Sequence, residues 1–180
     1  QRGTCMISIF LIDDHAVVRE GYRRLLERRA DLRVEAEAAS AEEALQRFRE
    51  VAPDVFIVDL SLPNMGGIEL IRRIVQRRPD ARILTFSMHR DPMFAAQAIR
   101  AGALGYVTKS SDPEVLIQAV YEVARKEKVL SPDIAPEMAI ALLEGKAHPA
   151  DELSPREFEI LRLLLAGQGA EEIGSILNIT

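Results

Sequence analysis

The sequence predicts an α/β fold, a doubly wound parallel sheet with helices on both of its faces. Two observations support this prediction. Short apolar runs alternate with stretches of helical periodicity along the first two thirds of the chain. Most of these runs lack the polar alternation of a strand with one wet face, which is typical of parallel strands buried on both sides. The alternation also indicates right-handed strand–helix–strand crossovers.

Five strands and five helices are expected in strict alternation. The strands fall at residues 7–12, 32–36, 55–58, 82–86 and 104–108, and the helices begin near residues 16, 41, 68, 92 and 113. Several helix starts carry signals of their own. Ser40 followed by Glu43 is a capping box, and the Asp-Pro pairs at 91–92 and 112–113 place a proline at the start of a helix.

Beyond residue 128 the pattern becomes purely helical. Residues 131–143 indicate a connecting helix, and residues 145–150 have the composition of a linker. A helix start at Ser154-Pro155 and a second short helix at 170–177 follow. The expected organisation is one domain at residues 6–128, a linker helix and linker at 129–150, and a partial all-α unit at 151–180.

The composition is that of an ordinary soluble protein, 48% hydrophobic and 28% charged over 180 residues. No apolar run approaches the ~18–20 residues of a membrane span, and the first residues are too few and too polar for a signal peptide. Cys5 is the single cysteine, so no internal disulfide is expected and a reducing cytoplasm is the expected location.

The charge distribution does not favour nucleic acid as a partner of these 180 residues. The net charge is −5, and residues 151–180 carry two arginines against six acidic residues, a net −4. Neither part has the basic footprint of a nucleic-acid-binding surface.

Polar side chains follow four of the predicted strands at the point where each strand ends. Asp13-Asp14 follow the first strand, Asp59 follows the third, and Ser87 and Lys109 follow the fourth and fifth. Because parallel strands point the same way, these side chains should meet at one edge of the sheet, where ligands bind in open α/β folds. Asp59 lies on the predicted central strand.

This set of side chains suits phosphoryl transfer. Neighbouring carboxylates repel one another, and a divalent cation relieves the repulsion. All-oxygen ligands without a Cys/His cluster favour Mg²⁺ or Mn²⁺. Lys109 and Ser87 supply a charge and a hydroxyl for phosphoryl oxygens. Asp59 then remains as the nucleophile that forms an aspartyl phosphate.

Taken one at a time, these residues have simpler explanations. Asp13-Asp14 can cap the helix that follows them, and Lys109 can be an ordinary surface lysine. Thr85 competes with Ser87 as the hydroxyl donor, but it lies two residues inside the strand. The convergence of all the positions at one edge favours the site over these alternatives.

Two other features stay outside the predicted site. His15 and His89 are far apart and isolated in the sequence, which does not indicate a metal site. The arginines between residues 19 and 29 favour a solvated helix face, with a partner surface as the alternative.

The motifs around the strand ends resemble those of the receiver domains of two-component response regulators. They are Leu11-Ile12-Asp13-Asp14-His15, Val58-Asp59-Leu60-Ser61-Leu62-Pro63-Asn64-Met65-Gly66-Gly67, Phe86-Ser87 and Gly105-Tyr106-Val107-Thr108-Lys109. The resemblance implies a flavodoxin-like (βα)5 fold. Residues 152–157 and 172–177 resemble the start of a LuxR-type helix-turn-helix domain, the pairing of the NarL/FixJ group of transcription factors.

The resemblance implies a role for each matched residue. Asp59 would accept a phosphoryl group from a phosphohistidine on a sensor histidine kinase. Asp14 and Asp59 would bind Mg²⁺ directly, with the main-chain carbonyl of Ser61, and Asp13 would act mainly through water. Lys109 would contact the phosphoryl group.

The resemblance also implies a switch. Ser87 would move toward the phosphoryl group and Tyr106 would change rotamer, although Tyr106 can also be a simply packed residue. Ser61 and His89 match positions that tune the lifetime of the phosphate. Phosphorylation would shift the population of conformers, and receivers would pair as homodimers or release the helix-turn-helix.

The resemblance to a LuxR-type domain is incomplete. Such a domain has four helices, of which the third enters the major groove. The sequence ends at Ile179-Thr180, where the turn into that helix is expected. DNA binding is therefore expected of a full-length parent rather than of residues 1–180.

Two other functions remain open. An aspartyl-nucleophile phosphohydrolase of similar fold typically carries a second Asp two residues after the nucleophile, where this chain has Ser61. A receiver can also act as a phosphorylation-independent interaction module, against which the presence of every acidic position and of Lys109 argues. The sequence favours the response regulator, which is not an enzyme.

Overall fold

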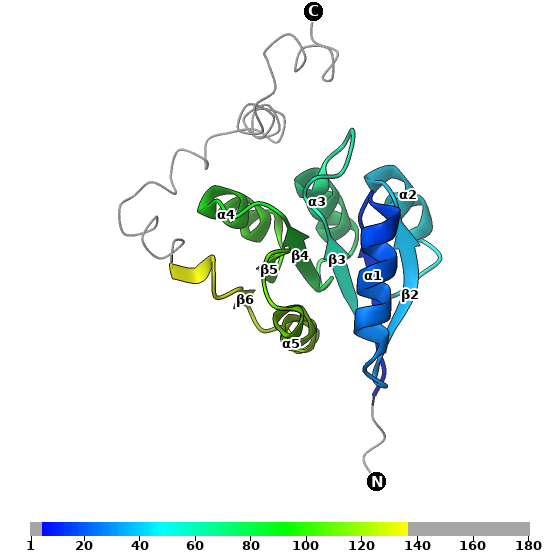
Figure 1. Cartoon of the computed structure of the whole chain (residues 1–180). Helices are drawn as coiled ribbons and strands as arrows, with labels where there is room; N and C mark the ends of the chain where they lie inside the picture. The colour runs from blue at the N-terminus through cyan, green and yellow to red at the C-terminus, as the bar shows by residue number, and fades with distance from the viewer. Residues whose placement is uncertain (1–4, 137–180) are drawn as a thin grey trace, which may run out of the picture.

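The computed structural model describes residues 5–136, and these form a three-layer α/β arrangement (Figure 1). The elements in chain order are β1 (Ile7–Ile12), α1 (Ala16–Glu27), β2 (Leu32–Ala38), α2 (Ala41–Arg47), β3 (Val55–Val58), α3 (Gly67–Arg77), β4 (Ile83–Ser87), α4 (Pro92–Ala101), β5 (Gly105–Thr108), α5 (Pro113–Ala124) and β6 (Val129–Leu130). The strands pair in the order β2-β1-β3-β4-β5-β6, and every pair is parallel. The predicted doubly wound sheet is confirmed. Most of the connecting helix predicted at residues 131–143, and all of the helices predicted within residues 151–180, lie outside the described residues.

Each face of the sheet packs against its own set of helices (Figure 1). Helices α2, α3 and α4 cover one face, and their core includes Phe10, Ile12, Phe56, Val58 and Tyr106 from the strands. Helices α1 and α5 cover the other face, where the strands contribute Ile9, Leu11, Val55, Ile57 and Val107. The two sets alternate along each strand because successive side chains point to opposite faces. This double burial explains why the strands are uninterrupted apolar runs.

The strand bounds follow the sequence closely, with one addition. The third strand is confirmed at Val55–Val58, and β2 extends two residues beyond its predicted end, to Ala38. Ser87 is the last residue of β4 rather than the residue after it. The sixth strand, β6, was not predicted. It has only two residues, too few for a periodic signal, and it exists because its backbone pairs with β5.

The predicted helix starts are confirmed by their caps. The Ser40 side chain accepts a hydrogen bond from the Glu43 amide, and the Glu43 carboxylate accepts one from the Ala39 amide. Asp91 and Asp112 cap α4 and α5 by accepting bonds from amides two residues ahead. These local bonds fix where the helices begin at the site end of the sheet.

No helix within residues 5–136 has both the length and the apolar character needed to cross a membrane. The Cys5 thiol is exposed and free.

Candidate functional site

The predicted site residues meet at the carboxyl edge of the sheet. Three of them continue the hydrogen-bonded ladder one residue past their own strands. The amides of Asp13, Asp59 and Lys109 donate to the carbonyls of Ala38, Ile12 and Ser87 at 3.1, 3.0 and 2.8 Å, respectively. Their backbones are thereby fixed by the sheet, which positions their side chains relative to one another.

Lys109 joins the two buried aspartates. Its Nζ lies 2.5 Å from Asp13 Oδ2 and 3.1 Å from Asp59 Oδ2. The three side chains are at most 6% exposed. Charges removed from water in this way need ionic partners, because an isolated buried ion is strongly disfavoured. The alternative that Lys109 is an ordinary surface lysine is therefore wrong.

The titration of the site follows from burial and charge. Burial raises the pKa of Asp59, and the Lys109 ammonium and the Ser61 amide oppose that rise without cancelling it. Burial alone would lower the pKa of Lys109, but the carboxylates of Asp59 and Asp13 raise it overall. The lysine therefore stays charged, and one cation faces a cluster of acidic side chains.

The acidic cluster fits a divalent cation. One ligand atom from each of Asp13, Asp14, His15 and Asp59 lies within 4.8 Å of the others. Asp14 Oδ1 is buried and accepts no hydrogen bond from the described residues, although His15 Nδ1 lies 2.9 Å away. A buried, unsatisfied carboxylate oxygen next to two more carboxylates is the donor set that Mg²⁺ or Mn²⁺ prefers.

His15 was not predicted to belong to this cluster. Its amide donates to Asp13 Oδ1 at 2.8 Å, and its ring Nδ1 lies 3.3 Å from the same oxygen. Its place directly after the acidic pair was the available signal. His15 is also the N-cap residue of α1, and its side chain makes no capping hydrogen bond. The Asp13-Asp14 pair therefore lies just before the N-cap position.

The loop after β3 folds tightly against Asp59. The Ser61 amide donates to Asp59 Oδ1 at 3.0 Å, which orients the carboxylate. A Cβ atom on Gly67 would lie 2.3 Å from the Asp59 carbonyl oxygen and 2.6 Å from Leu60 Cα. Gly66 has φ 73°, a backbone conformation that favours glycine. The Gly66-Gly67 pair thus lets α3 begin directly beside Asp59.

The two predicted switch residues lie on adjacent strands, β4 and β5, where Tyr106 is in register with Thr85, two residues before Ser87. Ser87 is fully buried, and its Oγ accepts a bond from the His89 amide at 3.3 Å. Tyr106 is fully buried as well, and its hydroxyl donates to the His89 carbonyl at 2.7 Å. Burial raises the pKa of Tyr106 far above its ordinary value. The competing hydroxyl, Thr85 Oγ1, is also buried and has no hydrogen-bond partner among the described residues.

His89 connects the site loop to the switch residues. Its Nε2 lies 3.2 Å from Ser61 Oγ, and its ring stacks on Phe94 with the centroids 4.3 Å apart. The same residue receives the Tyr106 hydroxyl at its carbonyl oxygen. His89 therefore links the loop after β3 to β5. The contact between Ser61 and His89 spans 28 residues, and no sequence pattern indicated it.

The arginines of α1 form a solvated, charge-compensated face rather than a basic patch. The three arginines of the helix pair with acidic residues, Arg19 and Arg23 with Glu37 and Arg24 with Glu20, and Arg29, just after the helix, pairs with Glu114. Exposed pairs of this kind contribute little to stability. The partner-surface alternative gains no support from this arrangement.

A doubly wound parallel sheet with a lysine bridging two buried aspartates at its carboxyl edge defines the class of receiver domains. The family model for the response regulator receiver domain matches residues 9–121. The model for bacterial regulatory proteins of the luxR family matches residues 151–180. The chain belongs to the response regulator family.

Individual relatives agree with this assignment. Response regulator UvrY of Escherichia coli (strain K12) is 34% identical over 177 residues, which cover 97% of this chain and 81% of that protein. Response regulator GacA of Pseudomonas aeruginosa is 33% identical over 161 residues, covering 88% and 75% of the two chains. A crystal structure of a LuxR-family two-component response regulator from Aurantimonas sp. SI85-9A1 is 51% identical, with a TM-score of 0.75, over 77% of this chain and 99% of that one.

A DNA complex is also among the similar structures. RcsB from Salmonella enterica serovar Typhimurium, bound to promoter rprA with the phosphomimetic BeF3-, is 26% identical with a TM-score of 0.73. The match covers 97% of this chain and 85% of that one.

These findings define the chain as a two-component response regulator that combines a receiver domain with a LuxR-type DNA-binding domain. The pocket of Asp13, Asp14 and Asp59 is typical of a phosphoacceptor site. Membership of a regulator family, not a family of catalytic enzymes, excludes the phosphohydrolase alternative.

Proposed function

We propose that Asp59 is the phosphoacceptor of this response regulator and that a sensor histidine kinase is its phosphodonor. The contact that carries this proposal is the pairing of Lys109 Nζ with Asp13 and Asp59 in a buried site. The lysine provides a fixed positive charge beside the carboxylate where phosphoryl oxygens would arrive. Phosphoryl transfer depends mainly on such positioning and charge neutralisation.

The transfer forms one bond and breaks one. A carboxylate oxygen of Asp59 attacks the phosphorus of the donor phosphohistidine, and a P–O bond forms. The P–N bond breaks, and its electron pair returns to the imidazole nitrogen of the donor. The Ser61 amide holds Oδ1 and orients the carboxylate for attack. Lys109 then pairs with a phosphoryl oxygen in place of the lost carboxylate charge.

Mg²⁺, or Mn²⁺ in its place, is the proposed metal, held by Asp13, Asp14 and Asp59 together with the main-chain carbonyl of Ser61. When bound, the ion neutralises the charge that develops on the phosphoryl oxygens. The buried and unsatisfied Asp14 Oδ1 supports this assignment.

The proposed switch consists of Ser87 and Tyr106. Ser87 is the last residue of β4, at the carboxyl edge of the sheet, and its hydroxyl accepts a bond from the amide of His89, whose carbonyl accepts the Tyr106 hydroxyl. A change at Ser87 therefore acts on the bond that holds the Tyr106 side chain. The population shift that results would favour homodimers and alter DNA binding by the LuxR-type part of the full-length protein. RcsB dimers bound to DNA are a precedent among the similar structures.

The proposed domain limits are residues 6–128 for the receiver, 129–150 for the linker helix and linker, and 151–180 for the LuxR-type part. The proposed location is the cytoplasm, where a histidine kinase can present its phosphohistidine. The prediction that residues 1–180 do not bind DNA without the rest of the LuxR-type domain concerns residues outside the described range.

The test compares the wild type with Asp59→Asn and with Asp80→Asn, a control that removes an exposed carboxylate. Each protein is incubated with acetyl phosphate and Mg²⁺, and the intact mass is measured. Gain of one phosphoryl group in the wild type and the control, but not in Asp59→Asn, is expected. Equal phosphorylation of Asp59→Asn would show that another residue is the acceptor. No acyl phosphate in any folded variant would instead favour the phosphorylation-independent interaction module.

The output is tested on the same proteins with beryllofluoride and Mg²⁺, with the molar mass followed by light scattering. The wild type and Asp80→Asn should shift toward dimer, whereas Asp59→Asn should not respond. A dimer of Asp59→Asn that forms only with beryllofluoride would separate dimerisation from this residue.

A further inference from the structure

The chain that leaves α5 returns to the sheet and pairs with the strand that carries Tyr106. The Val129 amide donates to the Leu104 carbonyl at 3.1 Å, and the Ser131 amide donates to the Tyr106 carbonyl at 2.9 Å. Residues 129–136 are therefore attached directly to β5. In sequence they are also the first residues of the segment that leads toward the LuxR-type part.

A cluster of hydroxyl side chains reinforces this attachment around one carboxylate, and we name it the Asp133 cluster. Its members are Thr108, Ser110, Ser111, Ser131 and Asp133. Asp133 accepts hydrogen bonds from Ser131 Oγ at 2.7 Å, from Ser110 Oγ and Ser111 Oγ at 3.3 Å, and from Thr108 Oγ1. Ser131 Oγ in turn accepts a bond from the Thr108 amide at 3.2 Å. The cluster thus ties the end of β5 to the start of the segment that follows β6.

The Asp133 carboxylate holds the cluster together, because it accepts hydrogen bonds from all four hydroxyl groups. Thr108 and Ser131 are fully buried, so their hydroxyls need partners inside the protein. Burial alone would raise the pKa of Asp133, but the bonds from Ser131 and Thr108 lower it overall. The group therefore remains a charged acceptor that can take several donors at once. A hollow of about 330 Å³, lined by Ser110, Ser111 and Asp133 among others, brings solvent to its outer side.

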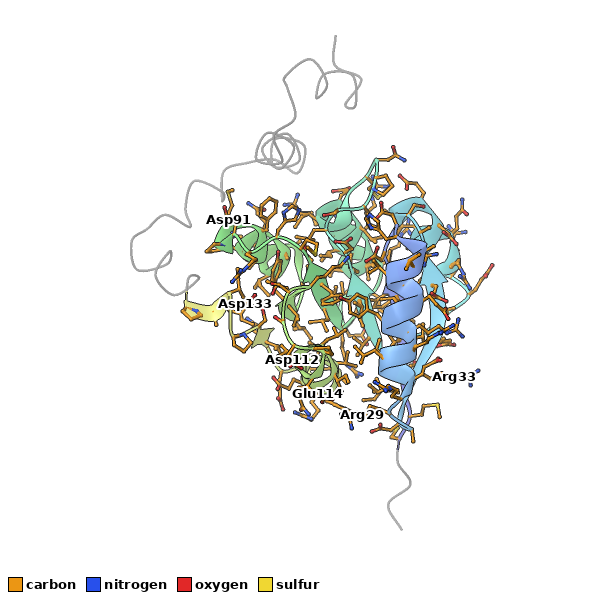
Figure 2. The ribbon with its side chains drawn as sticks, viewed as in Figure 1. Arg29, Arg33, Asp91, Asp112, Glu114 and Asp133 are labelled. Atoms are coloured by element: carbon orange, nitrogen blue, oxygen red, sulfur yellow. The ribbon has the colours of Figure 1, made fainter. Side chains whose placement is uncertain are left out.

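The Asp133 cluster contacts two segments that connect it to the candidate site, one next to Lys109 and one next to His89. Thr108 directly precedes Lys109, whose Nζ binds Asp13 and Asp59. Arg90 Nε lies 3.7 Å from Asp133 Oδ2, and Arg90 follows His89, the residue that receives the Tyr106 hydroxyl. In the view of Figure 2, Asp133 lies between α4 and α5, beside the end of β5.

We propose that Asp133 is a coupling residue, which holds the start of the interdomain segment on β5 and releases it when Asp59 is phosphorylated. This inference rests on the proposed function of Asp59. Phosphorylation removes the Asp59 carboxylate charge that Lys109 binds and offers phosphoryl oxygens instead, so Lys109 must change its partners. A displaced Lys109 shifts Thr108, its neighbour, and stretches the bonds from Thr108 and the two long bonds from Ser110 and Ser111. Water from the solvent-exposed side then replaces these donors.

A purely structural role makes a different prediction. If the Asp133 carboxylate only stabilised the sheet edge, it would slow amide hydrogen exchange in residues 129–136 equally with and without phosphorylation. If Asp133 is a coupling residue, it slows this exchange in the unphosphorylated state alone. The two roles are therefore separated by a measurement of local opening in both states rather than by stability.

The experiment is amide hydrogen exchange on the 180-residue chain, with and without beryllofluoride and Mg²⁺. The reporters are the amide of Ser131, which is hydrogen-bonded to the Tyr106 carbonyl, and the amides of Ile134 and Ala135, which are hydrogen-bonded to the Ser131 carbonyl. In the wild type, beryllofluoride should speed exchange in residues 129–136 by roughly tenfold or more, the effect of losing a bond to a charged acceptor. In Asp133→Ala, exchange there should be fast in both conditions, while the loop of residues 59–67 still responds to beryllofluoride.

Two further variants keep the result interpretable. Ser131→Ala removes the bond between the Thr108 amide and the cluster with a smaller change, and it should behave like Asp133→Ala even if the latter folds poorly. Glu127→Ala is the matched control, because it removes a nearby carboxylate that pairs with the exposed Arg125. It should behave like the wild type.

Several outcomes would overturn the proposal. An Asp133→Ala or Ser131→Ala chain that keeps the wild-type difference between the two conditions would show that the cluster does not couple. The same conclusion follows if beryllofluoride changes residues 59–67 but not residues 129–136 of the wild type. If neither segment of the wild type responds, the proposed function of Asp59 fails first, and the coupling role fails with it.

Discussion

Lys109 Nζ lies 2.5 Å from Asp13 Oδ2, a contact between residues 96 positions apart in the chain. The same nitrogen reaches Asp59 Oδ2 at 3.1 Å, so one ammonium group serves two buried carboxylates. The Lys109 ammonium group lies where it could pair with a phosphoryl group on Asp59. Before phosphorylation, the same ammonium group stabilises the folded domain by neutralising the two carboxylates. Four predictions follow from this site and from the backbone that positions it.

Replacing Lys109 by methionine should destabilise the domain by about 3–5 kcal/mol, because it leaves buried carboxylates without their cation. Urea unfolding at neutral pH measures the loss, and Lys128→Met, a change at an exposed position, should cost far less. Added Mg²⁺ should restore part of the stability of Lys109→Met. If Lys109→Met were as stable as the wild type in the absence of Mg²⁺, the pairing of Lys109 with the aspartates would contribute nothing to the stability of the domain.

Asp59→Asn should raise the free energy of unfolding at neutral pH. The pKa of Asp59 is raised in the folded state, so the folded protein binds this proton more tightly than the unfolded chain does. The wild type therefore loses stability as the pH rises from the ordinary aspartate pKa through the raised one. Urea unfolding of both proteins between acidic and neutral pH should show the advantage of the asparagine shrinking as the pH falls. If the difference in free energy of unfolding between the two proteins did not change with pH, the pKa of Asp59 would not be raised in the folded state.

Gly67→Ala should destabilise the domain, whereas Gly21→Ala should not. A Cβ atom at residue 67 would overlap backbone atoms of Asp59 and Leu60, which cannot move without disturbing the site, and a cost of about 1–3 kcal/mol or more is expected. A Cβ atom at residue 21, within α1, meets nothing within 4 Å and should stabilise the helix by about 0.5–1 kcal/mol. Thermal unfolding of the pair measures both effects. Equal effects at the two positions would remove the argument for a close approach at Asp59.

Mg²⁺ should raise the melting temperature of the wild type, because a ligand that binds only the folded state stabilises it by mass action. At a concentration about 100 times the dissociation constant the gain is about 2.7 kcal/mol. Asp14→Asn removes a ligand whose buried oxygen has no other hydrogen-bond partner among the described residues, and it should lose most of this gain. Glu127→Gln, which changes an exposed ion pair, should keep it. An undiminished gain in Asp14→Asn would place the ion elsewhere.

Much of the candidate site was predictable because parallel strands bring their carboxyl ends to one edge. Asp13, Asp59 and Lys109 each follow an apolar run, and the sheet ladder extends to their own amides. No knowledge of distances was needed to expect them together. His15 is different, because its membership depends on the direction of one side chain at the start of α1, which no periodic pattern records.

The contacts between loops were not predictable. The Ser61–His89 contact joins two loops whose paths are set by the packing of α3 and α4. The orientation of the His89 ring is fixed by its stacking on Phe94. The Asp133 cluster depends on β6, a strand of two residues that forms only because β5 offers it unpaired backbone groups. Short elements of this kind have no signal of their own in the sequence.

The sequence by itself determined the order of strands and helices, the caps at Ser40, Asp91 and Asp112, and the residues that gather at the strand ends. These depend on local periodicity and on the common direction of parallel strands, which are properties of short segments. Only the tertiary structure decided that Lys109 binds Asp13 and Asp59 at the same time and that Asp133 holds the chain leaving α5. Both depend on where buried charges find partners, and that is settled only when distant segments pack together.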